Sequence, residues 1–327
     1  MRPLFCIFTA VALGLSVGAG CAPAAKPHPP PTDAFYFPTG IAHAPFGDFK
    51  GQGVLAVASS NFDKRYDRGS LSVVKLDDLP DLPPMGAPPS DKLPQVTDLH
   101  LDPVSQVEIQ SLAGEVAVDF GRIVFHADGS EDVEHSKLRD KVRFFVASRD
   151  EGASLQFLDF DGTGLHCPYA DLSADDPRDC FSKAPSLISN QSTKSGLPRA
   201  PAPYGVSVFV PDNIGDAQLF VTHLQSADSP AGSGTGQSAF LVQTSAEDVK
   251  ITNDSFIDLK SGNTANSIVL TERWAFLTGR YFNDTNGGQI LRFVERATGN
   301  IVPARLEAEF YSLEARGIAL QDPNATG

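Results

Sequence analysis

Residues 54–61 read VLAVASSN, an apolar run that ends in small and polar residues, and residues 69–77 follow with GSLSVVKLD. In the second stretch Leu71 and Val73 alternate with serines, so the apolar side chains fall on one face. Alternation with β-branched residues is typical of a strand that buries at least one face. The more continuous apolar run before it is typical of a strand that is covered on both faces. The two stretches are thus predicted to be strands of one antiparallel unit.

The same pattern recurs three more times along the chain. Its echoes are FFVASRD at 144–150, LFVTHLQ at 219–225 and AFLTGRY at 275–281. Each echo follows a short apolar run and precedes an alternating one, and the four units start at Gly40, Gly114, Tyr204 and Asn266. Repeated antiparallel units of three or four strands, none of which can bury its faces alone, are the sequence pattern of a β-propeller. The chain is therefore predicted to be all-β, a propeller of antiparallel meander blades.

The last segment predicts that the ring is incomplete. Residues 305–310, RLEAEF, fit the outer strand of the fourth unit, and RGIALQDPNATG begins a fifth unit at Arg316. Because a closed ring leaves no sheet edge exposed, we expect a longer propeller, of which four blades and the first strand of a fifth are present. A non-functional fragment is the alternative interpretation of this ending.

These repeats resemble a known family. LAVASSN followed by GSLSVVKLDDL is similar to the YVTN-type propeller repeat, with its LYVAN and VSVIDTATG segments, and QILRFVERATGNIV is similar to the second of these segments. The resemblance runs from Phe35 to the C-terminus with long insertions. It implies propeller architecture, and it implies no catalytic residues, because the repeats of this family specify architecture alone. WD40 repeats fit less well, since their Gly-His and Trp-Asp signatures are missing and the sole tryptophan is Trp274.

The N-terminus has the pattern of an export signal. A cationic start at Arg2, an apolar stretch and small residues before Cys21 predict a signal peptide over residues 1–20. Cys21 resembles the acylated cysteine of a bacterial lipobox, although Gly18 stands where that motif usually has leucine. Simple secretion is the alternative, and Ala22 favours the outer membrane over retention at the inner one. Residues 21–34 are predicted to be the lipidation site and a proline-rich tether, with the partial propeller over 35–327.

The two remaining cysteines, the net charge and the histidines limit the classes of site and partner that the chain can have. Cys167 and Cys180 bracket a polar, acidic loop, and in an exported protein such a pair most simply forms a disulfide. The formal net charge of −14, without a basic stripe, disfavours a nucleic-acid partner. The seven histidines form no HExxH, helical pair or CxxCH motif, so neither metal catalysis nor covalent haem has motif support.

Oxygen-rich turns are the candidate binding segments. Corresponding loops carry Arg65 with Tyr66 and Arg280 with Tyr281, a candidate recognition surface if the loops share one rim. Weak candidates for calcium ligands are Asp159, Asp161, Asn283 and Asp284. Such residues in turns more often satisfy backbone groups than bind an ion.

Together these observations predict a non-enzymatic binding or scaffold module in the bacterial cell envelope, either an outer-membrane lipoprotein or a secreted protein. Its partner would be an envelope protein, a surface glycan or a small ligand, and the N-terminal lipid would be its membrane contact. No cofactor is expected beyond the calcium candidates. The alternative is a propeller enzyme, a lactonase-like hydrolase or an oxidoreductase, with a divalent-ion site in the central channel. Acidic groups meeting in that channel would favour the enzyme, and ordinary packing residues would favour the binding module.

Overall fold

The computed structural model describes four repeated β-sheets and the turns around them. The residues described are 28–45, 53–76, 106–126, 128, 130–135, 141–149, 154–168, 178–180, 203–210, 218–224, 237–243, 252–258, 266–271, 273–282, 287–297, 300–301 and 305–310. No helix long and apolar enough to cross a bilayer occurs within these ranges.

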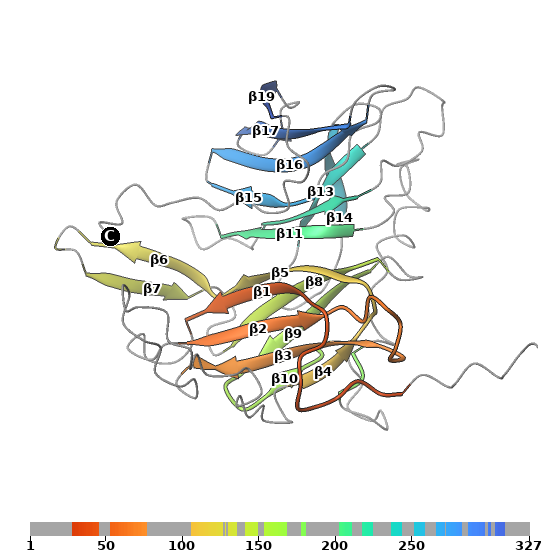
Figure 1. Ribbon diagram of the computed structural model, residues 1–327. Helices are drawn as coiled ribbons and strands as arrows, with labels where there is room; N and C mark the ends of the chain where they lie inside the picture. Colours follow the sequence, from red (N-terminus) through yellow and green to blue (C-terminus); the bar gives the residue numbers. More distant parts are fainter. Residues whose placement is uncertain are drawn as a thin grey trace, which may run out of the picture.

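The first two sheets form the lower half of the molecule in Figure 1. Sheet I has the order β1 (Pro38–Ala44), β2 (Val54–Ser59), β3 (Gly69–Lys75) and β4 (Gln106–Ile109). Sheet II has the order β5 (Ala113–Asp119), β8 (Val142–Ser148), β9 (Ser154–Phe160) and β10 (Leu165–His166). Between β5 and β8 the chain forms a separate hairpin of β6 (Gly121–Phe125) and β7 (Glu131–His135), which the repeat pattern did not predict.

The other two sheets repeat the meander. Sheet III has the order β11 (Pro203–Phe209), β12 (Gln218–His223), β13 (Gln237–Gln243) and β14 (Thr252–Asp258). Sheet IV contains β15 (Ile268–Leu270), β16 (Trp274–Phe282), β17 (Gly287–Ala297), β18 (Asn300–Ile301) and β19 (Arg305–Phe310), with both β18 and β19 paired to β17. All these strand pairs are antiparallel, so the predicted all-β antiparallel class is confirmed, as is the outer strand at residues 305–310.

Sheet II is buried on both faces, as its continuous apolar run predicts. Every residue of β8 is buried. Val142, Phe144 and Val146 join a core cluster with sheet I, whereas Phe145 and Ala147 join a second cluster with sheet III. Phe145 packs edge-on against Phe157 with ring centroids 5.3 Å apart. The three sheets are therefore stacked face to face through side chains that alternate along one strand.

The first strands of the sheets contact one another in order: β1 contacts β5, β5 contacts β11, and β11 contacts β15. Each of β1, β5 and β11 has a register irregularity near its start, where a glycine lies against the next sheet. A Cβ atom on Gly40 or Gly114 would lie under 3.0 Å from a backbone oxygen of the following first strand, and one on Gly205 would lie as close to the carbonyl of Asn266, which precedes β15. Because glycine alone fits there, these positions allow the sheets to meet backbone to backbone.

Candidate functional site

The four first strands line one cavity of about 470 Å³. In Figure 1 these strands, β1, β5, β11 and β15, lie one above another through the middle of the molecule. The lining residues come in four short segments: 39–42, 115–118, 206–208 and 267–269. Most of these residues are aliphatic, but polar and apolar atoms contribute almost equally to the exposed surface of the cavity.

Glu115 is the one residue with an ionisable side chain among the described residues that line this cavity. Its carboxyl group accepts hydrogen bonds from the Ser267 side chain and from the Val206 backbone, and so it joins β5 to the next two sheets. Burial raises the pKa of Glu115 to about 7, although both hydrogen bonds oppose the shift. Near neutral pH this carboxyl can therefore either hold or release a proton.

Three hydroxyl groups add hydrogen-bonding capacity to the walls, those of Thr39, Ser207 and Ser267. The Thr39 Oγ1 donates to the Ala113 carbonyl at 2.9 Å and so links β1 to β5. The Ser267 hydroxyl contacts Glu115, as described above. Of these three hydroxyl groups, that of Ser267 is the one shown to contact the Glu115 carboxyl.

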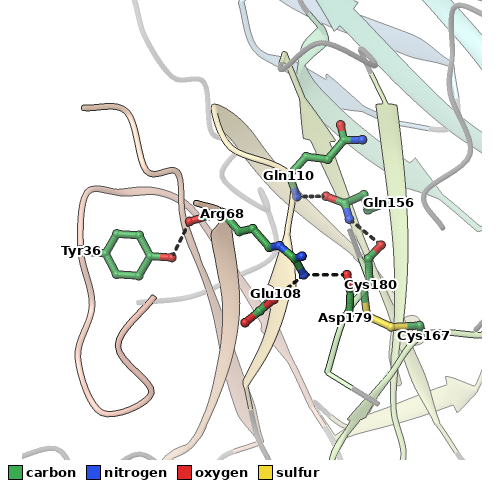
Figure 2. Close-up of polar contacts among 8 residues, drawn as sticks. All are labelled: Tyr36, Arg68, Glu108, Gln110, Gln156, Cys167, Asp179 and Cys180. Carbon is green, nitrogen blue, oxygen red and sulfur yellow. Dashed lines mark hydrogen bonds and ion pairs between the residues drawn. A yellow bond between two sulfur atoms is a disulfide. The ribbon is translucent and has the colours of Figure 1, made fainter. Parts of the chain in front are cut away.

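A second polar cluster closes the junction between sheets I and II (Figure 2). Arg68, which directly precedes β3, pairs with Glu108 of β4 at 2.6 Å and with Asp179 at 3.0 Å. Asp179 precedes Cys180, which forms a disulfide with Cys167, the two Cα atoms being 5.5 Å apart. The pairing expected from the sequence is thus present, and it brings residues 178–180 against β4.

The disulfide segment extends sheet I by a short parallel bridge. Glu108 N–H donates to the Arg178 carbonyl at 2.8 Å, and Cys180 N–H donates to the Glu108 carbonyl at 3.2 Å. Buried Gln156 of β9 donates to the Cys180 carbonyl at 3.2 Å and accepts from the Gln110 N–H at 2.8 Å, as Figure 2 shows. Every polar group in this chain of contacts has a protein partner, so the cluster is a structural joint between two sheets.

Of the four residues predicted to form a recognition rim, the structure describes the side chains of Arg65 and Tyr66. Arg65 has a side chain that is 67% exposed and pairs with Asp63 at 3.3 Å. Tyr66 packs against Tyr36 with ring centroids 4.6 Å apart, and its backbone is held by both ends of the Asn61 amide. Arg280 and Tyr281 pair through their backbones with β17, and their side chains lie outside the described part. No contact joins the two loops among the residues described, so the structure does not assemble them into one surface.

The calcium candidates do not form a site among the described residues. Asp159 is buried and accepts from Arg143 at 2.6 and 3.0 Å, and it also pairs with Lys141. Asp161 lies in an exposed turn and accepts a hydrogen bond from the Thr163 hydroxyl. This bond is the largest of the effects that lower the pKa of Asp161 to about 2. Within the described ranges no three histidine, cysteine or acidic residues gather to hold a metal. Asn283 and Asp284 lie outside the described residues.

The proline-rich segment contacts sheet I well before residue 35. His28 forms a parallel bridge with Tyr66, and its carbonyl accepts from the Asp67 N–H at 3.0 Å. Pro30 is buried, and the Pro31 carbonyl accepts from the Gln106 side chain at 3.0 Å. From residue 28 onward the segment predicted as a tether is therefore part of the folded structure. The lipidation candidate Cys21 lies outside the described residues.

Sequence reasoning missed both Glu115 and the cavity. The run GEVAVDF reads as an ordinary alternating strand, in which Glu115 falls on the polar face. One signal was available: the units that start near Gly40, Tyr204 and Asn266 have no acidic residue in their first strands, whereas this unit places one there. A charged residue at a repeat position that is uncharged in the other units indicates a role separate from the repeat itself.

Comparisons with known proteins add little to this description. No family model matches the sequence, and no curated protein matches it. A solved structure described as a glycoside hydrolase is similar over 82% of this chain and 46% of its own, with 10% identity and a TM-score of 0.27. The chain thus spans about half the length of that structure, and a likeness of this size carries no argument about fold or chemistry.

Proposed function

We propose that this chain is an exported, lipid-anchored β-propeller of the bacterial cell envelope, which binds a small ligand in its central cavity without catalysing a reaction. In this proposal sheets I to IV are consecutive blades and the cavity is part of the central channel. The shared cavity is the observation that carries the proposal, because it is built from the same strand of each of the four repeats.

The packing of the first strands supports the propeller arrangement. Each of three first strands repeats the same irregularity and presents a glycine to the next first strand. A repeat that places equivalent strands side by side around a shared space is the geometry expected of blades around an axis. Residues far apart in the sequence then contribute equally to the lining.

The composition of the lining supports binding over catalysis. A divalent ion in the channel would require several oxygen ligands, usually including more than one carboxylate. Among the described lining residues Glu115 alone supplies a carboxylate. A cavity of this size, lined by aliphatic residues, three hydroxyl groups and one carboxyl, suits the capture of a small ligand, which favours this class of partner over an envelope protein or a glycan.

Two features of the chain support export. The N-terminal sequence has the order of a signal peptide followed by Cys21, and the Cys167–Cys180 disulfide fits an oxidising compartment. An anchor at Cys21 would leave six residues before the segment that contacts sheet I begins at His28. The folded part would then lie close to the lipid surface.

Anchoring is tested by producing the full chain in a Gram-negative host. We expect the protein in the membrane fraction, with an N-terminal peptide whose mass shows acylated Cys21, and we expect Cys21→Ala to be released. An unmodified Cys21 in a soluble protein would contradict the anchoring.

Binding is tested by native mass spectrometry after exposure to a small-molecule extract of bacterial envelopes. We expect the wild type to retain a small molecule that Ser207→Trp, which fills the cavity, loses. The control Ser130→Trp places the same side chain at an exposed serine and should retain it. Calcium-dependent hydrolysis of a lactone by the wild type, abolished in Ser207→Trp, would instead establish the enzyme.

A further inference from the structure

We propose that the central cavity binds a small primary amine, with its ammonium group on the Glu115 carboxylate and its alkyl body against the aliphatic walls. This inference rests on the proposed function and names the class of ligand.

The size and lining of the cavity indicate the size and the apolar character of the ligand. A volume of about 470 Å³ falls within the range of small-molecule sites. Seven aliphatic residues larger than alanine occur in the lining, of which Val116, Val206 and Ile268 are buried: Ile41, Val116, Val118, Val206, Val208, Ile268 and Val269. Ile41 is 62% exposed, although isoleucine is usually buried. A ligand with an apolar body would cover this surface and gain hydrophobic stabilisation.

The single ionisable group sets the charge of the ligand. Glu115 receives hydrogen bonds from Ser267 and from Val206, which fix its orientation. A carboxylate has about four lone-pair positions, so two such bonds leave acceptor positions for a ligand. A cation compensates the unfavourable burial of this charge, whereas an anion would add to it. The cavity therefore favours cations over neutral or anionic molecules of the same shape.

The kind of cation follows from what surrounds the carboxyl. No aromatic residue occurs among the described residues of the lining, so it offers neither the cage that binds quaternary ammonium groups nor a platform on which a sugar ring could stack. A primary ammonium has three N–H donors. It can therefore bond to the Glu115 carboxylate and to the Ser267 oxygen beside it at the same time.

The pH dependence follows from the ionisation of Glu115. Burial raises its pKa to about 7, so below neutral pH the carboxyl is increasingly protonated and loses its attraction for the ammonium group. Titratable groups on the strands packed against β5 are His43 on β1, Arg143 on β8 and Tyr204 on β11, and β5 itself carries Asp119. The pKa of Glu115 is set by its burial and by its hydrogen bonds with Ser267 and the Val206 backbone. The pH dependence of ligand binding should therefore follow the ionisation of Glu115.

The test is isothermal titration calorimetry of the full chain with hexylammonium, and with hexanol, hexanoate and tetramethylammonium as matched probes. At pH 8 we expect hexylammonium to bind at least about tenfold more tightly than each of the other three. Its affinity should fall at least about tenfold between pH 8 and pH 5. Glu115→Gln should lose at least about tenfold in affinity, whereas Asp128→Asn, which removes an exposed carboxylate on the β6–β7 hairpin, should change nothing.

Equal binding of hexanol or hexanoate, a flat pH profile, or full affinity in Glu115→Gln would overturn the inference. The probe and pH series need only the wild type, so the test holds even if Glu115→Gln does not fold. If hexanol binds equally well and Ser207→Trp abolishes its binding, the amine is wrong but the cavity still binds ligands. If no probe binds, the inference fails, and the envelope-extract experiment decides the proposed function separately.

Discussion

Glu115 occupies a position that is uncharged in the other three sheets. Glu115 directly precedes the paired residue Val116, and the residues that precede the corresponding paired residues of the other first strands are Gly40, Gly205 and Ser267. In sheet II the close approach to the next sheet is made by Gly114 instead, one residue earlier. This shift allows a charged side chain into the cavity without separating the sheets.

The raised pKa of Glu115 makes the stability of the protein depend on pH. The folded state binds the proton more tightly than the unfolded chain does, because the pKa rises from 4.5 to about 7 on folding. The stabilisation contributed by Glu115 is thus fully present below about pH 4.5 and is lost as pH rises through about 7. Urea unfolding should find Glu115→Gln equal to the wild type at pH 4 and more stable at pH 8 by on the order of 2 kcal/mol. A constant difference between the two proteins at all pH values would contradict the buried position.

The buried pair of Arg143 and Asp159 makes a second prediction at this scale. Both side chains are at most 5% exposed and are joined by two hydrogen bonds. Asp159→Asn removes the negative charge beside a buried guanidinium and should lower the free energy of unfolding by about 3 kcal/mol. Asp161→Asn, at a carboxyl that is 43% exposed, is the control and should cost less than about 1 kcal/mol. Equal effects of the two substitutions in urea titrations would be inconsistent with the buried pair.

At the scale of elements, the first strands depend on glycine for their close approach. A methyl group on Gly114 would collide with the Tyr204 backbone of β11, which has no flexible side chain to move aside. Gly114→Ala should therefore destabilise the fold by about 3 kcal/mol, through separation of sheets II and III. Chemical denaturation measures the loss, and wild-type stability in this variant would mean that the two strands are not in contact.

The disulfide segment is the other element with a measurable role. It closes a loop with a sequence separation of 13 and holds residues 178–180 against β4. Replacing both Cys167 and Cys180 by serine should lower stability by about 3 kcal/mol. It should also speed hydrogen exchange at the Glu108 amide, which donates to Arg178. Unchanged exchange at Glu108 would mean that the cross-link does not hold the segment in place.

The strands that bury apolar faces could be predicted from the sequence, because burial imposes a period of two or a continuous apolar run. The β2 and β8 strands follow this rule closely. The β6–β7 hairpin could not be predicted in this way, because the β7 sequence EDVEH has no apolar alternation. The place of Glu115 could not be predicted either: alternation assigns it to a polar face, and only the packing of β5 between β1 and β11 turns that face toward a cavity.

At the scale of the whole molecule, neighbouring sheets share their hydrophobic cores. Sheet II supplies side chains to two core clusters at once, one shared with sheet I and the other with sheet III. The first strands meet in chain order along the middle of the molecule, where the cavity lies (Figure 1). The proposed blade arrangement would account for the small residue near the start of each first strand, Gly40, Gly114, Gly205 and Ser267.

The most direct test of this account is a nuclear Overhauser experiment on the full chain, selectively labelled at glycine, valine and tyrosine. Gly40 lies against the Val116 backbone nitrogen and Gly114 against the Tyr204 Cα. We predict cross-peaks between the α protons of Gly40 and the Val116 amide proton, and between the α protons of Gly114 and the Tyr204 α proton. Absence of both, with the β2 and β8 strands assigned and paired as described, would show that the first strands do not meet and would contradict the shared cavity.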